Sequence, residues 1–473
     1  MVMATHTRSS GAGAQRPPAQ GPGPGSQTPP ASSPRRLSRR SVLRGTAALG
    51  GAAALTGGLT ACSGSGTFAT GGRTPVRIWD LFTGADGERM QTMQAACMKA
   101  HKDVSIESTT LSWGSAYYTK LAMASSGGRP PEAAVMHMSR LAGYAPGGLL
   151  EPFDLDRLAA YGVTRKDFAP AVWERATYKG ELFALPLDTH PFITFYSPKV
   201  VRKAGLLDSS GKMRSLDSKD AFLDAGRSMA RATGKYGMSF GYLLDTAQSW
   251  RLFWGLYGQT GGQYRMVPGS SAQLDESAAI EVLSFIQEVL NGKIASRNAD
   301  YAGAIAAFSS GKAGMILSGE WEIVGFKASM PDVAAMPFPK IFDKPANYAD
   351  SHAFVLPKQD YPDEKRREAT YKVLADLVKN RSLTWAEGGH IPAYMPVLAT
   401  GAYRKLSPQR DYAAASKIVT LDPKVWFAGA GSDFQARMCD AMAPTLQGQK
   451  TAKQGVEAML SQLDRLLAAP QPM

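Results

Sequence analysis

The chain has 473 residues, which is more than one compact core usually holds, so its length predicts two domains or lobes. Its composition, with 44% apolar and 20% charged residues and three cysteines, excludes a collagen-like chain, a wholly disordered chain and a disulfide-built scaffold. The net charge of +13 suggests nucleic acid, but residues 1–61 carry seven arginines and no acidic residue. The other 412 residues have 46 basic and 40 acidic side chains without a dense basic patch, which argues against nucleic-acid binding.

The N-terminal region has the pattern of an export signal. Residues 1–34 are rich in Pro, Gly, Ser, Gln and Ala and cannot bury enough apolar surface to fold. Arg39 and Arg40 precede a short, weakly apolar, glycine-rich stretch at 45–61, which resembles a twin-arginine signal. The alternative is an ordinary secretory signal that happens to contain two arginines.

The apolar stretch ends at Leu59-Thr60-Ala61-Cys62, which resembles a bacterial lipobox. That resemblance implies cleavage before Cys62 and acylation of its thiol and amine, so that acyl chains hold the protein at a membrane surface. The alternative is a cysteine that lies near a cleavage site by chance. Residues 63–74 are a Gly/Ser/Thr tether, and no later apolar run is long enough to span a bilayer. We therefore expect a protein anchored by lipid to the outer face of the cytoplasmic membrane.

From residue 75 onward, strands and helices alternate. Strands are predicted at 75–81, 104–111 and 132–138, and helices at 88–101 and 116–125. This alternation favours an α/β fold with mostly parallel sheets covered on both faces. Phe82, Trp113 and His137 lie at or just after the carboxyl ends of the three strands, where open α/β sheets bind their ligands.

The alternation continues to the end of the chain. Further helices are predicted at 219–233, 276–291, 299–310, 321–329, 363–379 and 456–468, and further strands at 236–243, 313–317 and 348–356. There is no internal repeat at a fixed period.

Four motifs in a fixed order identify a known family. They are KGELFALP at 179–186, TFYSPK at 194–199 followed by Ala204-Gly205-Leu206, FSSGKAGM at 308–315 followed by Gly319-Glu320-Trp321, and GGHIPA at 388–393. This order resembles that of the bacterial extracellular solute-binding proteins of family 1, the capture subunits of sugar-importing ABC transporters, over essentially all of 75–470. Residues 188–191 and Glu322 fit no general pattern of the family, so the resemblance does not carry over the identity of the ligand.

The resemblance implies a two-lobed, type II periplasmic-binding-protein-like fold with a hinge. Mapped onto this chain, lobe one comprises 75–187 plus 351–400, and lobe two comprises 188–350 plus 401–473, after a signal at 1–61 and a tether at 62–74. The strands that cross between the lobes are expected near 185–192 and 350–356. The resemblance also implies a carbohydrate ligand, ABC permease subunits as partners, no catalysis and no cofactor, and we expect a monomer.

A sugar site needs aromatic planes for the C–H faces and fixed polar groups for the hydroxyls. The predicted ligand-binding residues are Phe82, Thr83, Asp86, Trp113, His137, Asp188, His190, Trp254, Glu320, Trp321, His352 and His390. Trp250 and Trp426 are weaker candidates. Each tryptophan could equally be part of the core. Asp188 and His190 could instead form a hinge ion pair, Glu320 could complement a helix dipole, and each histidine could be structural.

Other functions remain as alternatives. Asp188 and Glu320 could form the carboxylate pair of a secreted glycoside hydrolase, or the receptor could bind a peptide, a polyamine or a phosphorylated polyol. The G-x-S-x-G match at 237–241 lies within an apolar strand-like run and does not predict a nucleophile elbow. No metal-binding motif, clustered His/Cys ligands or phosphate-binding loop is present in the sequence, so we expect no metal site. Cys97 and Cys439 are expected to be free thiols, since a disulfide would pin the two lobes together.

Overall fold

The first lobe is built around a six-stranded sheet in the computed structural model, which describes residues 72–470. Its strands are β1 (Thr74–Asp80), β2 (Val104–Thr110), β3 (Ala133–His137), β4 (Leu150–Glu151), β7 (Ala184–Pro186) and β15 (His352–Pro357). Strand β1 lies between the edge strand β2 and the central strand β3 and runs parallel to both, whereas β15 runs antiparallel to β3. The side chains of β1 alternate between buried and half-buried, and β3 is buried throughout, as expected for an edge-to-centre progression in a covered sheet.

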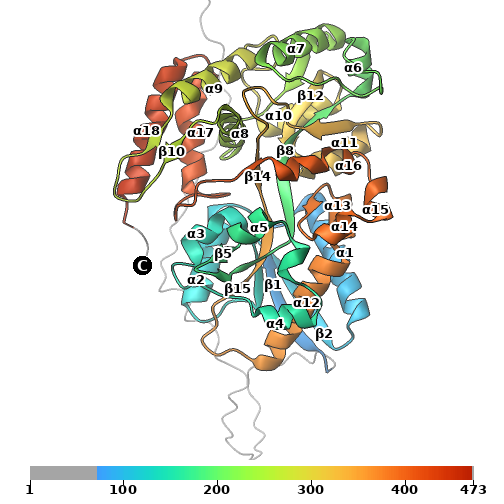
Figure 1. The fold of residues 1–473 in the computed structure, drawn as a ribbon, viewed down its shortest axis with the longest axis vertical. Coiled ribbons are helices and arrows are strands. Elements are labelled where there is room, and N and C mark those ends of the chain that lie inside the picture. Colours follow the sequence, from blue (N-terminus) through green and yellow to red (C-terminus); the bar gives the residue numbers. More distant parts are fainter. Residues whose placement is uncertain (1–71, 471–473) are drawn as a thin grey trace, which may run out of the picture. The chain divides into compact units, whose positions relative to one another are not determined.

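Helices cover both faces of this sheet (Figure 1). They are α1 (Gly84–Ala100), α2 (Ser115–Ser126), α3 (Leu141–Tyr144), α4 (Leu155–Ala160), α5 (Pro170–Arg175), α12 (Glu364–Asn380) and α13 (Ser382–Glu387). A small hairpin of β5 (Thr177–Tyr178) and β6 (Glu181–Leu182) follows α5. On α1, Met90, Met93 and Cys97 recur at helical spacing and are buried against the sheet, so the predicted apolar face is present.

The second lobe contains a seven-stranded sheet organised around β8. Its strands are β8 (Asp188–Tyr196), β9 (Tyr236–Ser239), β12 (Ala313–Gly319), β13 (Ala334–Pro337), β14 (Asn347–Asp350), β16 (Ile391–Pro392) and β17 (Val419–Thr420). Every strand that pairs with β8 runs antiparallel to it, and only β12/β9 and β14/β17 are parallel pairs. This sheet is therefore mixed rather than mostly parallel, because β8 enters it from the first lobe in the opposite direction.

The helices of the second lobe pack around this sheet and beside it (Figure 1). They are α6 (Pro198–Lys203), α7 (Lys219–Thr233), α8 (Gln248–Thr260), α9 (Glu276–Val289), α10 (Tyr301–Ser309), α11 (Ile323–Ser329), α17 (Asp433–Leu446) and α18 (Ala452–Ala468). The hairpin of β10 (Tyr264–Arg265) and β11 (Gln273–Leu274) connects α8 to α9, and α14 (Met395–Leu398), α15 (Gly401–Lys405) and α16 (Gln409–Tyr412) follow β16. The G-x-S-x-G segment lies in β9 and the loop after it, not at a strand-to-helix turn.

The chain passes between the two sheets at three points, because it also leaves the first lobe after α13 and enters the second sheet at β16. Two of these passages lie side by side. β7 ends in the first sheet at Pro186 and β8 begins in the second at Asp188, whereas β14 ends at Asp350 and β15 begins at His352. The two passages touch each other, because the backbone N–H of Leu187 donates to His352 O at 2.8 Å. The fold class is confirmed as α/β with two lobes, and the cores of the lobes are separate clusters.

Some predictions lie outside residues 72–470. The arginine pair Arg39 and Arg40, the lipidation site Cys62 and most of the tether belong to that group. Among the helices that the structure describes, none has the length and apolarity needed to cross a bilayer.

Candidate ligand-binding site

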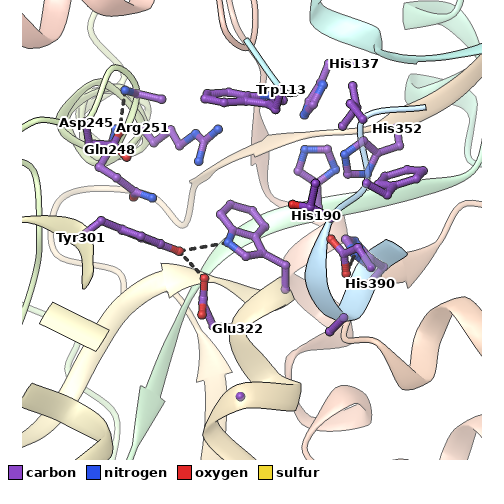
Figure 2. Close-up of a pocket in the computed structure, with 18 residues that line it drawn as sticks. Trp113, His137, His190, Asp245, Gln248, Arg251, Tyr301, Glu322, His352 and His390 are labelled. Carbon is purple, nitrogen blue, oxygen red and sulfur yellow. Dashed lines mark hydrogen bonds and ion pairs between the residues drawn. The ribbon is translucent and has the colours of Figure 1, made fainter. Parts of the chain in front are cut away.

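A pocket of about 550 Å³ opens between the two sheets (Figure 2). Side chains of the first lobe, including Phe82, Trp113 and His137, line one side, and side chains of the second lobe, including Arg251 and Trp321, line the other. This volume lies within the range of pockets that enclose small molecules. The walls combine aromatic rings with imidazole, carboxylate, amide and guanidinium groups.

The first lobe presents its pocket residues from the carboxyl ends of parallel strands. Phe82 follows β1, Trp113 follows β2, and His137 is the last residue of β3. Because parallel strands end at the same edge, these side chains meet there, as the order of the sequence elements predicts. The ring centroids of Trp113 and His137 lie 6.5 Å apart. Trp113 is 38% exposed, so part of its indole surface is open to a ligand.

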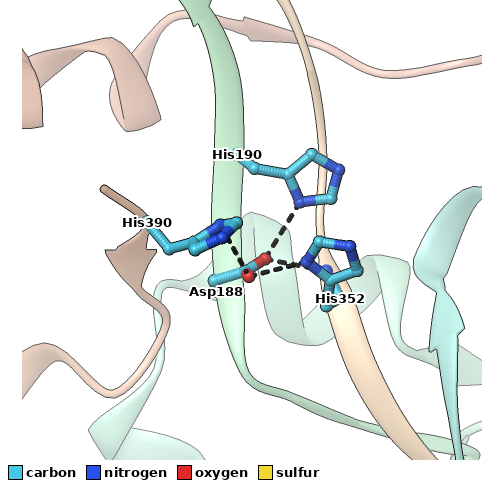
Figure 3. Close-up of side chains that lie close together, drawn as sticks. All are labelled: Asp188, His190, His352 and His390. Carbon is cyan, nitrogen blue, oxygen red and sulfur yellow. Dashed lines mark hydrogen bonds and ion pairs between the residues drawn. The ribbon is translucent and has the colours of Figure 1, made fainter. Parts of the chain in front are cut away.

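Asp188 is the hub of a buried cluster beneath the pocket (Figure 3). Its carboxylate lies 3.0 Å from His190 Nδ1, 2.8 Å from His352 Nδ1 and 3.2 Å from His390 Nδ1. It also accepts hydrogen bonds from the Trp385 Nε1–H at 2.7 Å and from the backbone N–H of His352 at 2.8 Å. Burial by itself would raise the pKa of Asp188, but its contacts with His352 and His190 outweigh burial and hold this pKa well below its ordinary value.

This arrangement fixes the orientation of His190. Burial, reinforced by the neighbouring His352, lowers the pKa of His190 to about 3, so the ring is neutral at neutral pH. Since a carboxylate only accepts hydrogen bonds, the single ring proton lies on Nδ1 and is donated to Asp188. The Nε2 lone pair of His190 then faces the pocket as a hydrogen-bond acceptor. Burial also lowers the pKa of His137 well below its ordinary value, with smaller effects of His352 and His190.

His390 has the opposite charge state. Burial opposes its protonation, but Asp86, Glu320 and Asp188 raise its pKa well above the ordinary value. Its Nε2 lies 3.1 Å from Asp86 Oδ1, and its Nδ1 lies 3.1 Å from Glu320 Oε1. Burial raises the pKa of Glu320 to about 8 despite the hydrogen bond to His390. The cluster therefore holds a cationic His390, an ionised Asp188 and a protonated Glu320 at neutral pH.

On the second-lobe side, Trp321 is held by a hydrogen-bond chain. Its Nε1–H donates to the Tyr301 hydroxyl at 3.1 Å, and that hydroxyl donates to Glu322 Oε1 at 2.5 Å (Figure 2). Burial raises the pKa of Glu322, although the Tyr301 hydrogen bond acts against this. The chain fixes the plane of the Trp321 indole at the pocket wall, which is what stacking against a flat ligand face requires.

The family is shown by a sequence match over most of the folded part. Residues 84–374 match the model of the bacterial extracellular solute-binding proteins. The chain belongs to this family. A search of curated proteins found no sequence that matches the chain significantly.

The fold of this solute-binding protein is shared by solved structures. The GacH receptor of Streptomyces glaucescens, solved without ligand and with acarbose, is 18% identical, with 84% of this chain and 98% of that chain covered and a TM-score of 0.69. Maltose-bound MalE3 of T. maritima is 15% identical over 83% and 99% of the two chains, with a TM-score of 0.70. A solute-binding protein of Thermotoga lettingae bound with α-D-tagatose is 19% identical over 84% and 100%, with a TM-score of 0.68. At these identities the similarity shows the fold.

Nine of the twelve predicted ligand-binding residues line the pocket of this solute-binding protein. They are Phe82, Thr83, Asp86, Trp113, His137, His190, Trp321, His352 and His390. Two of the other three, Asp188 and Glu320, are fully buried beneath it. They orient the histidines that line the pocket rather than facing a ligand themselves. Neither Asp188 nor Glu320, the carboxylate pair of the alternative glycoside hydrolase, therefore lines the pocket.

Trp254 does not reach the pocket. It lies on α8 in the core of the second lobe, is 1% exposed, and its Nε1–H donates to Leu421 O at 2.9 Å. Its ring stacks between Trp250 and Tyr257 with centroids 4.8 and 5.5 Å away. The structure therefore corrects the expectation for Trp254, because this face of α8 packs against Leu421 and Tyr264 of the second lobe and not into the cleft.

Sequence reasoning missed the contribution of α8 and α10 to the pocket. Gln248 and Arg251 come from the first turn of α8, and Asp245 precedes that helix; Tyr301 begins α10. No motif marks these residues, and no helix was predicted at 248–260. Glu322, which follows the Gly-Glu-Trp segment and departs from the family pattern, does line the pocket beside Tyr301.

Among residues 72–470, two groups of side chains could hold a metal ion, although the sequence showed no clustered ligands. Asp188, His190, His352 and His390 bring ligand atoms within 4.8 Å of one another, as do Cys97, His101 and Asp376. In the first group the Asp188 oxygens already accept N–H donors, so the histidine Nδ1 protons would have to leave before a cation could replace them. Both Cys97 and Cys439 are buried, unpaired thiols, and they belong to the cores of different lobes.

Proposed function

We propose that this solute-binding protein captures a mono- or oligosaccharide between its lobes and delivers it, unaltered, to the permease of an ABC importer. The observation that carries the proposal is a pocket between two lobes with fixed indole rings on opposite walls, Trp113 and Trp321, and polar groups around them. Indoles stack on the C–H faces of a sugar, while imidazole and carboxylate groups bind its hydroxyls.

Capture works through a change in population between open and closed lobes. A ligand that contacts both walls binds the closed arrangement better than the open one, so binding shifts the equilibrium toward closure. The chain passages at Leu187 and Ser351 lie beside each other and form part of the hinge. Asp188 and His352 immediately follow these passages, so they lie at the hinge itself. Their mutual hydrogen bonds therefore persist when the lobes close, and the histidines that line the pocket keep their positions.

The protein acts outside the cytoplasmic membrane in this proposal. The Arg39-Arg40 pair directs export, and Cys62 carries the lipid anchor, so that the tether gives the receptor freedom to reach its permease. A chain with Cys62→Ser should be exported but released from the membrane, whereas Arg39→Lys with Arg40→Lys should leave the unprocessed chain inside the cell.

Titration of tryptophan fluorescence with a panel of mono- and disaccharides tests the capture of sugar. We expect saturable binding that is weakened at least tenfold, or by about 1.4 kcal/mol, by Trp321→Ala. Trp426→Phe is the matched control, because Trp426 lies outside this pocket and should leave the affinity unchanged.

The same titration separates the alternatives. Release of a cleaved product from a glycoside would favour the hydrolase. Binding of peptides, polyamines or polyol phosphates, without binding of saccharides, would show that the receptor captures a solute other than a sugar. Saccharide binding that is equal in wild type and Trp321→Ala would contradict the proposed stacking site.

A further inference from the structure

Arg251 is a buried cation without a hydrogen-bond or ion-pair partner among the residues that the structure describes. It lies in the first turn of α8, lines the pocket, and is only 9% exposed. Among residues 72–470, its side chain makes no hydrogen bond or ion pair, and its buried Nε has no acceptor. The equally buried Arg175, by contrast, has a hydrogen-bond partner, since its Nη2 donates to Asp422 O at 2.8 Å. Burying a charged group without a partner is unfavourable, because the charge loses its hydration and gains nothing in return.

Aromatic rings surround the guanidinium but do not satisfy its donors. Its Cζ lies 5.8 Å from the ring centroid of Trp113, 5.2 Å from that of Trp321 and 5.9 Å from that of Tyr348. Cation–π contacts of this kind favour the charged form. The five N–H donors of an arginine still need oxygen acceptors in the plane of the guanidinium, which the faces of flanking rings cannot supply.

The acidic residues of the pocket are all engaged elsewhere. Asp86 pairs with His390, and Glu322 accepts from Tyr301. Asp245 Oδ1 accepts from the backbone N–H groups of Ala247 and Gln248, both at 2.8 Å, at the start of α8. The pocket therefore contains one guanidinium whose charge no neighbouring carboxylate contacts directly. In a protein that binds solutes, the missing acceptor is most simply supplied by the solute.

We infer that the ligand is an acidic saccharide and that Arg251 binds its carboxylate. This inference rests on the proposed function and adds the chemical class of the sugar. The planar guanidinium matches a carboxylate with two parallel N–H···O bonds. A uronic acid has a carboxylate in place of the primary alcohol and keeps the apolar ring face that stacks on an indole.

A carboxylate fits this pocket better than a phosphate group. One carboxylate brings a single negative charge, which Arg251 balances alone. A phosphate monoester brings nearly two negative charges close to Asp86 and Glu322, which would repel it. The hydroxyls of the sugar would donate to acceptors such as His190 Nε2.

Calorimetric titration with matched pairs of sugars tests this inference on the folded protein. The pairs are galacturonate with galactose, glucuronate with glucose, and 1,4-linked digalacturonate with 1,4-linked galactobiose. We expect the acid of at least one pair to bind at least tenfold more tightly than its neutral partner. Arg251→Gln should weaken binding of that acid about 100-fold, at least tenfold more than it weakens binding of the neutral sugar, whereas Arg251→Lys should give an intermediate loss. Arg437→Gln removes an exposed charge of the second lobe and should change neither affinity.

Each outcome decides between distinct conclusions. Wild-type protein that binds the neutral members as tightly as the acids, or an Arg251→Gln variant that loses both equally, would overturn the inference and leave saccharide capture standing. If only simple carboxylates such as citrate bind, and Arg251→Gln abolishes this binding, Arg251 is the carboxylate site and the saccharide proposal fails. Absence of binding to every sugar and carboxylate would overturn both. The wild-type comparison decides the matter even if Arg251→Gln does not fold.

Discussion

Individual residues of the cluster beneath the pocket have charge states that their amino-acid types do not reveal. Asp188 and Glu320 are both fully buried carboxyl groups, yet the pKa of Asp188 is lowered and that of Glu320 is raised. The difference follows from their partners, because Asp188 accepts several N–H donors, whereas the Glu320 carboxyl makes one ion contact with His390 among residues 72–470. The cluster thereby fixes which nitrogen of His190 faces the pocket.

Glu320 should give the protein a measurable pH dependence. Glutamate in an unfolded chain ionises near pH 4.3, whereas the pKa of Glu320 in the fold is about 8. The folded state therefore binds more protons between these pH values, and stability falls as pH rises through this window. Glu320→Gln keeps the shape of the protonated group and cannot ionise. We expect its stability relative to wild type to grow by about 1–2 kcal/mol between pH 6.5 and 8.5.

Denaturant unfolding at several pH values measures this effect. His190 is buried and neutral in the folded protein, so it lowers the stability of the fold as the pH falls below about 6.5 toward 3. Measurements above pH 6.5 avoid this second effect. Glu387→Gln, which removes an exposed partner of Arg89, is the control and should show no such trend. A constant difference between Glu320→Gln and wild type across this window would show that Glu320 is already ionised.

At the scale of elements, helix α8 decides the chemistry of the second-lobe wall. It carries Gln248 and Arg251, and it was not predicted because eleven of its thirteen residues are buried. A helix buried on nearly all sides lacks the apolar stripe with a period of 3.6 residues that sequence analysis detects. Strands β1, β2 and β3 have clear boundaries in the sequence, so the residues after them could be predicted.

Gly255 sets the position of α8 against the second sheet. A Cβ at this residue would lie 2.7 Å from the backbone N of Tyr348 in β14, a contact that no side-chain movement can relieve. We expect Gly255→Ala to destabilise the protein by about 1–3 kcal/mol, because the helix must shift away from the strand. Thermal and denaturant unfolding without ligand measure this loss.

Gly325 in α11 is the matched control. A Cβ there meets nothing within 4 Å, so Gly325→Ala should stabilise the ligand-free protein slightly through helix propensity. Equal stability of Gly255→Ala and wild type would mean that α8 does not depend on this close approach.

At the scale of the whole molecule, the two lobes have separate cores and are joined by the chain passages and by contacts such as the hydrogen bond from Arg175 to Asp422 O. Cys97 and Cys439 lie in different cores, and burial raises their pKa values to about 12 and about 11. Neither thiol should therefore react in the folded protein, since thiolate is the reactive form. In Cys62→Ser protein, a thiol reagent at pH 8 should detect almost no thiol before unfolding and about two after unfolding without reductant. Detection of none after unfolding would mean that a disulfide has formed.

The sequence alone determined the family, the α/β class and the first-lobe wall of the pocket. Ordered motifs and residues at strand ends are local features that can be recognised without coordinates. The tertiary structure decided that Trp254 is a core residue, that Asp188 and Glu320 support the wall from beneath, and that Arg251 reaches the pocket. The physical reason is that these roles depend on which face of a buried element meets the cleft. That choice is made by packing between segments more than 100 residues apart, such as α8 and α17.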